Sequence, residues 1–177
     1  NSSPASVASE ARGIEGGRLA RWLDRAARAL ALTGGAALAG LALMTCISIA
    51  GRALGRGPVP GDFELVEAGT AFAVFAFLPW CQLRRGHVTV DLLLARAGER
   101  ANAGADAVAD LLMTLVALVL ARQLWLGLLD KARFDETSFI LEFPIWWAYA
   151  ACLPGALLFV AAAGWSTVAS LRRAMAG

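Results

Sequence analysis

The feature that most constrains this chain is the length of its uncharged runs. Residues 29–51 carry no charged side chain and are bounded by arginines, and residues 143–171 carry no charge at all. An α-helix needs about 20 apolar residues to cross the hydrocarbon core of a bilayer. Residues 65–83 and 107–129 are also long enough, although both contain ionisable side chains. The sequence therefore predicts four membrane-spanning helices, at 29–51, 65–83, 107–129 and 146–170.

The third predicted span is the least apolar, because it includes Asp110 and Arg122. Each charge would cost roughly 2.5–3.5 kcal/mol at the centre of a spanning helix. Both residues lie near the ends of 107–129, where such side chains reach the interface. We expect the leucine-rich centre, from Leu111 to Leu120, to outweigh this cost.

Composition agrees with lipid as the main solvent of the chain. Charged residues make up 17% of the sequence, whereas soluble domains have about 25%. A net charge of +2 gives no electrostatic support for nucleic-acid binding. His87 is the single histidine, and Cys46, Cys81 and Cys152 lack metal-ligand spacing, so we expect no metal and no cofactor. No nucleophile with an oxyanion donor is recognisable, and the sequence predicts an all-α integral membrane protein that is not an enzyme.

Basic residues are distributed unevenly between the two sides of the predicted spans. Eleven lie before the first span, between the second and third, or after the fourth, whereas five lie in or beside the other two connections. Because lysine and arginine are retained on the cytoplasmic side, we predict that both termini are cytoplasmic. Trp146 and Trp147 begin the fourth span at the opposite interface, where amphipathic rings are favoured.

The segment before the first span has a different pattern. Residues 1–17 are rich in serine, alanine and glycine, and we predict that they are disordered. In residues 18–28, apolar side chains that include Trp22 recur at helical spacing, while four arginines that include Arg25 occupy another face. This pattern is typical of a basic amphipathic helix on the membrane surface, in contact with lipid. The alternative is a cytoplasmic extension of the first span. In either case residues 18–177 form one membrane domain.

Small residues predict where the spans approach one another. The first span holds two pairs spaced four apart, Gly35–Ala39 and Ala36–Gly40, and the fourth holds Gly155 and Gly164. Small side chains let helices come close in lipid, where no hydrophobic effect draws them together. We therefore expect helix contacts at these positions.

Two carboxylates, Glu64 and Glu67, lie three residues apart at the start of the second span. They could couple transport to a proton or a cation, as in a self-contained small four-helix exporter of the multidrug-resistance type. They could instead form an interfacial pair that caps the helix or meets a basic group of a partner. Their position one turn from the membrane edge favours the second interpretation.

Two polar stretches are candidate interfaces with a partner or with lipid. The ionisable residues of the first, which directly follows the second span, are Arg84, Arg85, His87 and Asp91. We expect them to set depth and partner contacts at the cytoplasmic face. The connection 130–142 combines apolar residues with charged ones such as Asp135 and Glu136. It is either a docking surface on the periplasmic side or a cap over the bundle.

Three motifs stand at fixed places relative to the spans. They are GDFEL at 61–65, LRRGHVTVD at 83–91, and PIWWAY at 144–149 with Pro154-Gly155 behind it. Their order and spacing resemble those of the small membrane subunit (DctQ-like) of tripartite ATP-independent periplasmic (TRAP) transporters, over about Trp22 to Arg173. The run of arginine, glycine, histidine, valine and aspartate is the most specific part. Glu67 departs from the pattern, since a neutral or apolar residue is expected there.

The resemblance implies a function that composition does not show. Such subunits pair, as a heterodimer, with a large M-type transport subunit that carries the substrate and sodium sites. A periplasmic solute-binding protein delivers an organic acid to the pair for symport across the bacterial inner membrane. The small subunit then serves as a scaffold that widens the static part of the transporter.

Overall fold

The computed structural model describes residues 4–84 and 99–176, and it describes the side chains of residues 17–84 and 108–171. Four helices account for most of these residues: α1 (Pro4–Ala53), α2 (Asp62–Leu83), α4 (Glu99–Phe134) and α5 (Trp146–Ala176). The described part has no strand beyond one isolated bridge between Thr137 and Pro144. The prediction of an all-α chain is confirmed.

Each helix contains a stretch that is long and apolar enough to cross a membrane. These stretches are Gly17–Ala53, Asp62–Leu83, Val108–Phe134 and Trp146–Leu171. An isolated helix satisfies its own backbone hydrogen bonds, which is the condition for crossing lipid. The chain is therefore a multi-pass membrane protein, and the four predicted spans are confirmed.

The third span extends further than the sequence predicts. α4 does not end near residue 129 but continues to Phe134. Its last turn is retained because Lys131 Nζ donates to Glu136 Oε2 at 2.5 Å, just beyond the end of the helix. Arg122 consequently lies in the middle third of the apolar stretch Val108–Phe134. Its position relative to the membrane interface stays a prediction.

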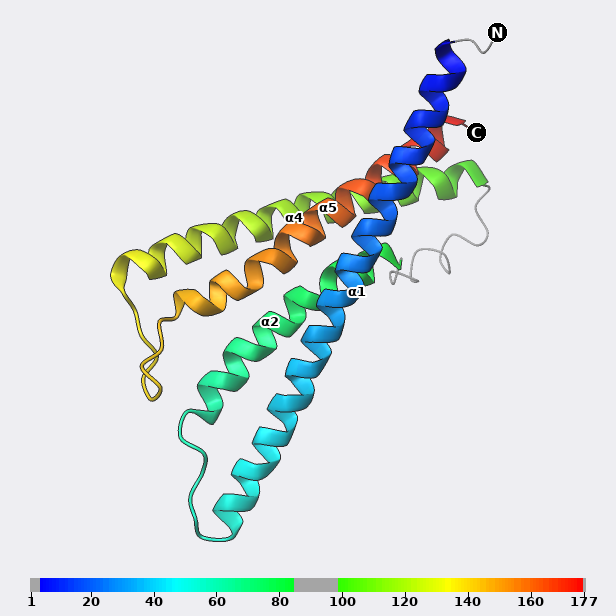
Figure 1. Cartoon of the computed structure of the whole chain (residues 1–177). Coiled ribbons are helices and arrows are strands. Elements are labelled where there is room, and N and C mark those ends of the chain that lie inside the picture. The colour runs from blue at the N-terminus through cyan, green and yellow to red at the C-terminus, as the bar shows by residue number, and fades with distance from the viewer. Residues whose placement is uncertain (1–3, 85–98, 177) are drawn as a thin grey trace.

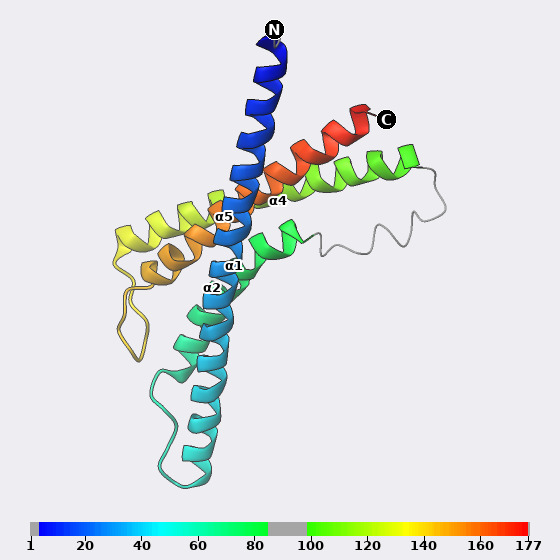
Figure 2. The same cartoon turned by 45° about the vertical axis from the view of Figure 1, so that its right-hand side comes forward.

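The helices form two antiparallel hairpins, which meet mainly through α2 and α5 and to a smaller extent through α1 and α5. α1 pairs with α2, α4 pairs with α5, and α5 packs along α2. Figures 1 and 2 both show the hairpins crossing, with their connecting loops pointing apart and the two chain termini beyond the crossing, at the other end of the molecule. We call this the arginine-rich end. The opposite end, with the connections 54–61 and 135–145, is the loop end.

α1 is one continuous helix with no break near residue 17 or residue 28. Residues 4–17, for which the sequence predicts disorder, form its first turns. Residues 18–28 do not form a separate surface helix, so the structure adopts the alternative, an extension of the first span. Burial gives the reason: Leu23 and Ala27 are buried in the bundle, whereas Trp22 is 63% exposed. Leu23 and Ala27 of this segment therefore pack on protein, whereas Trp22 stays outside that contact.

The contact between α1 and α2 recurs every seven residues along α1. A Cβ on Gly34 would lie 2.8 Å from the Cβ of Ala76, and the side chain of Leu41 occupies the space beside Gly69. Ser48, seven residues further on, is also buried. A seven-residue repeat keeps one stripe of a helix turned toward its neighbour.

The glycine contacts predicted from sequence are only partly correct. Nothing lies within 4 Å of a Cβ placed on Gly35, Gly40 or Gly164, so the helix contacts predicted at these glycines are wrong. At Gly155 the prediction is confirmed, because a Cβ there would meet the backbone carbonyl oxygen of Phe75 at 2.4 Å. In α1 the contacting glycine is Gly34, one residue before the predicted one.

Candidate functional site

The loop end is held together by two carboxylates in the first turn of α2. Asp62 accepts hydrogen bonds from Ser48 Oγ at 2.5 Å, from Arg52 Nη2 at 3.0 Å and from the backbone N–H of Phe63 at 2.8 Å. Ser48 in turn accepts from the N–H of Val59 at 3.2 Å. These bonds fix the end of α1 and its connection to the start of α2.

Glu64 binds the second connection. Its carboxylate accepts from Ser138 Oγ at 2.7 Å and from the backbone N–H groups of Ile140 and Leu141 at 2.8 and 3.0 Å. The Leu141 side chain also fills the space where Gly61 would carry a Cβ, and Gly61 has a φ of +74° that glycine adopts without strain. Glu64 therefore anchors residues 138–141 to α2.

The anchored connection has its own internal structure. Ser138 N–H donates to the Phe143 carbonyl at 3.0 Å, and Ile145 N–H donates to the Glu136 carbonyl at 2.9 Å. Asp135 turns the chain with a φ of +50° and is exposed. At the tip the side chain of Phe139 is 100% exposed. The connection thus presents an aromatic side chain on a fixed backbone.

Glu67 differs from its two neighbours in α2. It is exposed, and no described residue bonds to its carboxylate. It lines a cavity of about 580 Å³ between α2 and the α4–α5 hairpin, together with Phe75, Lys131, Tyr149 and other residues. Glu64 and Glu67 look equivalent in the sequence. In the structure the Glu64 carboxylate is held by hydrogen bonds, whereas the Glu67 carboxylate has no described partner.

The tryptophan pair stands at the loop end of α5. The rings of Trp146 and Trp147 meet edge to face, with centroids 6.0 Å apart, and Trp147 is exposed. Paired indoles of this kind suit the membrane interface.

The polar run after α2 is described only at its start. The guanidinium of Arg84 lies 4.4 Å from the centroid of the Trp80 ring, a cation–π contact. Arg85, His87 and Asp91 lie outside the described residues. What this run contributes to an interface stays a prediction.

A polar network inside the bundle was missed by sequence reasoning. Asp110 of α4 accepts from Gln82 Nε2 of α2 at 3.5 Å and from Ser170 Oγ of α5. One turn away, the hydroxyls of Thr114 and Thr167 are 2.8 Å apart. Gln82 and Ser170 are buried. The sequence signal was the presence of polar residues inside three spans, although nothing there shows that they meet.

Replacing Asp110 with alanine removes the acceptor that joins α2, α4 and α5. We expect the free energy of unfolding to fall by about 1.5–3 kcal/mol, the range for hydrogen bonds to a charged group. Denaturation of the purified chain in mixed micelles measures this. Asp130→Ala is the control, since Asp130 is exposed and forms no hydrogen bond with a described residue, and it should change stability by less than ~0.5 kcal/mol. Equal stability of the two variants would contradict the bridging role of Asp110.

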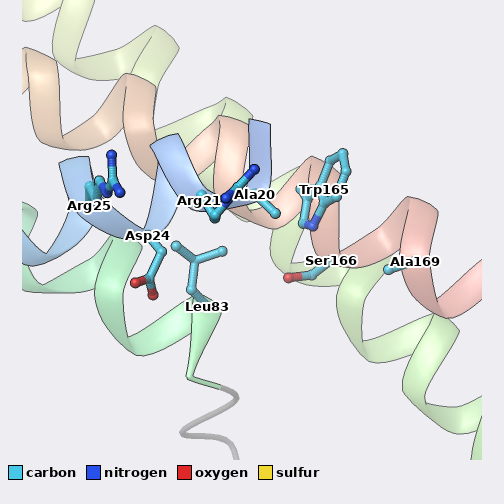
Figure 3. A pocket seen from close by; sticks show the side chains of 8 residues that line it. All are labelled: Ala20, Arg21, Asp24, Arg25, Leu83, Trp165, Ser166 and Ala169. Atoms are coloured by element: carbon cyan, nitrogen blue, oxygen red, sulfur yellow. The ribbon is translucent and has the colours of Figure 1, made fainter. Parts of the chain in front are cut away.

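A second hollow, of about 480 Å³, lies at the arginine-rich end (Figure 3). Arg21, Asp24 and Arg25 of α1 line it, together with the end of α2 and with Trp165 of α5. Arg21 Nε donates to the Gly17 carbonyl at 3.0 Å, while Arg25 is exposed and has no described partner. The hollow therefore offers two cationic groups and one carboxylate beside an indole ring.

Within the described residues, no three histidine, cysteine, aspartate or glutamate side chains lie close enough together to hold a metal ion. Cys46, Cys81 and Cys152 are all free thiols. The candidate site therefore consists of charged side chains at the two ends of the bundle. Some of them are hydrogen-bonded within the chain, such as Glu64, and others have no described partner, such as Glu67 and Arg25.

Comparison with known proteins gives one result. No curated protein and no solved structure matches the chain significantly. The family model for tripartite ATP-independent periplasmic transporters, DctQ component, matches residues 41–174, well over half of the chain. The match covers about the last quarter of α1, all of α2 and α4, and nearly all of α5. The chain therefore belongs to the DctQ component family of tripartite ATP-independent periplasmic transporters.

Proposed function

We propose that this chain is the scaffold subunit of a TRAP-type secondary transporter and pairs with a large M-type transport subunit. The observation that carries the proposal is how little of each span the chain itself covers. Only 6%, 17%, 11% and 39% of the most apolar part of the four spans is buried. A bundle this open has its apolar faces available to lipid and to another membrane protein.

The alternative function, a self-contained exporter, finds less support. Glu64 is engaged by a hydroxyl and two backbone N–H groups, which leaves it poorly suited to exchange a proton or a cation. Glu67 is free of described partners but lies only five residues from the start of α2. We assign Glu67 instead to contact with the large subunit at the loop end.

The substrate and coupling ion of the proposed transporter would be handled by its other subunits. An organic acid, delivered by a periplasmic solute-binding protein, would enter through the large subunit in symport with sodium. The loop end offers this soluble protein a defined surface, because Glu64 holds the backbone that presents Phe139 and Ile140 to solvent.

The distribution of arginine supports placement in the bacterial inner membrane with both termini in the cytoplasm. The start of α1, the end of α2 and the end of α5 share the arginine-rich end, where the hollow beside Arg21 and Arg25 lies. Lipid phosphate is the ligand that cationic pockets at this depth select. We assign these two arginines to phospholipid contact.

Co-purification tests the proposal directly. The tagged chain is co-expressed with the large subunit and isolated in mild detergent, and we expect a stoichiometric complex with bound phospholipid. Proteoliposomes with this complex, the binding protein and a sodium gradient should take up substrate, whereas the large subunit alone should not. Isolation of the chain by itself or as a homodimer would contradict the scaffold function. Unaltered phospholipid content in Arg25→Gln would contradict the lipid contact only.

A further inference from the structure

Arg122 occupies an unusual depth for a charged side chain. Phe134, the end of α4, is about 18 Å away along the helix axis, at 1.5 Å per residue. Contacts with α5 bracket its position: Thr114 meets Thr167 on one side, and Gly127 meets Tyr149 on the other. Arg122 is thus level with the central part of α5, well inside the span.

The surroundings of Arg122 are apolar and uncovered. Residues spaced alternately four and three apart form one stripe along α4: Leu111, Leu115, Leu118, Arg122, Trp125 and Leu129. The five apolar members are between 37% and 60% exposed, and Arg122 is exposed as well. The side of α4 that packs on α5 is a different one, marked by the fully buried Ala117. We call these six residues the α4 stripe.

Arg122 lacks the bonded partners that several charged residues in the described spans have. Asp62, Glu64, Asp110 and Lys131 all have a partner within the chain. Arg122 has no hydrogen bond, ion pair or ring contact with any residue in the described part. A charge at this depth is costly in lipid and is normally paired or placed against water.

We propose that the α4 stripe is the docking surface for a membrane-spanning helix of the large transport subunit, and that a carboxylate on that helix pairs with Arg122. The inference rests on the proposed function. A spacing of alternating four and three residues is the pattern that lets two helices pack along one seam. A guanidinium inside that seam selects an aspartate or glutamate, with which it forms two parallel hydrogen bonds.

Two other occupants of the stripe fit less well. A lipid headgroup fits less well, because Arg122 lies about 12 Å along the helix axis from Asp130, the next charged residue toward the loop end. A second copy of this chain, docked through the same stripe, would bring Arg122 toward Arg122. Between Asp110 and Asp130, α4 carries no carboxylate that could pair with it. A partner of different sequence is therefore required.

The test is co-purification of the tagged chain with the large subunit, for the wild type and for three variants. Arg122→Glu should lower the yield of complex by about tenfold or more, because a carboxylate would then face a carboxylate. Arg122→Lys should retain part of the yield. Arg133→Gln, a matched loss of an exposed arginine at the end of the same helix, should not alter it. Replacing the partner carboxylate with lysine in the large subunit should restore the Arg122→Glu complex.

Measurements on the chain alone separate docking from folding. Arg122→Leu should leave the stability of the isolated chain in detergent unchanged or improved, since it removes a charge with no described partner. If the wild-type complex forms and Arg122→Glu forms it equally well, this inference is overturned while the scaffold function stands. If Arg122→Leu destabilises the isolated chain enough to account for a lower yield of complex, Arg122 acts in folding and the inference is also overturned. Failure of the wild type to form any complex would overturn both.

Discussion

Gly155→Val is expected to lower the free energy of unfolding of this bundle by ~3 kcal/mol or more, at the upper end for overpacked cores. A Cβ at this position would lie 2.4 Å from the carbonyl oxygen of Phe75 and 2.7 Å from its carbonyl carbon. Those atoms belong to the backbone of α2, so no side-chain rotation can make room. The two helices must separate, and the α1–α2 hairpin then loosens from the α4–α5 hairpin.

Denaturation of the purified chain in mixed micelles, followed by circular dichroism, measures this effect. The matched control is Gly164→Ala in the same helix, where nothing lies within 4 Å of an added Cβ. Alanine there should stabilise the chain by up to ~1 kcal/mol through helix propensity alone. Gly155→Ala should fall between the control and the valine variant. If Gly155→Val unfolds like the wild type, α2 and α5 do not approach each other at this point.

The number and type of elements could be predicted from sequence because lipid leaves few options. A chain in a bilayer must satisfy every backbone group internally, so long uncharged runs become helices. Helix ends were harder to predict. The third span was expected to end near residue 129, where charges begin, but Lys131 finds Glu136 across a turn and the helix continues. The sequence alone does not show that Lys131 and Glu136 meet, because their contact depends on the turn that follows α4.

The face of α1 that packs on α2 could not be predicted from the sequence either. α1 is rich in glycine and alanine on every side, so several small-residue pairs look equally able to form a contact. Moving the choice by one residue, from Gly35 to Gly34, rotates the contact by about 100° around a helix of 3.6 residues per turn. Only the positions of Ala76 in α2 and its neighbours select Gly34. The contacting face of α1 is thus determined by tertiary packing, which the sequence pattern of one helix does not contain.

The candidate site shows the same limit for polar residues. Glu64 and Glu67 were recognised as a pair because they are close in sequence. Their roles differ through contacts that are far apart in sequence, since Ser138 and the N–H groups beside it reach Glu64 alone. In the sequence Asp110 has the position of a flanking charge, whereas in the structure Gln82 and Ser170 from two other helices meet it inside the bundle.

Glu64→Gln and Glu67→Gln are expected to affect different properties. Glu64→Gln should loosen the connection 135–145 in the isolated chain, whereas Glu67→Gln should weaken assembly with the large subunit. In the isolated chain Glu64→Gln should raise amide hydrogen exchange at Ile140 and Leu141 by about tenfold or more, because a neutral amide accepts their N–H groups less strongly. Glu67→Gln should leave these rates unchanged, since Glu67 forms no hydrogen bond with the connection. Hydrogen-exchange mass spectrometry in detergent gives both values.

For assembly of the complex, Glu67→Gln should have the larger effect of the two variants. Glu67→Gln removes the one carboxylate near the loop end of α2 that has no described partner, and it should reduce the yield of complex with the large subunit. Glu64→Gln should assemble normally but bind the solute-binding protein more weakly, since the backbone that presents Phe139 is no longer fixed. Normal assembly of Glu67→Gln would remove Glu67 from the interface. Unchanged exchange in Glu64→Gln would show that the Ser138–Leu141 turn holds its shape without the anchor, and the contact with the binding protein would then have to be sought elsewhere on the loop end.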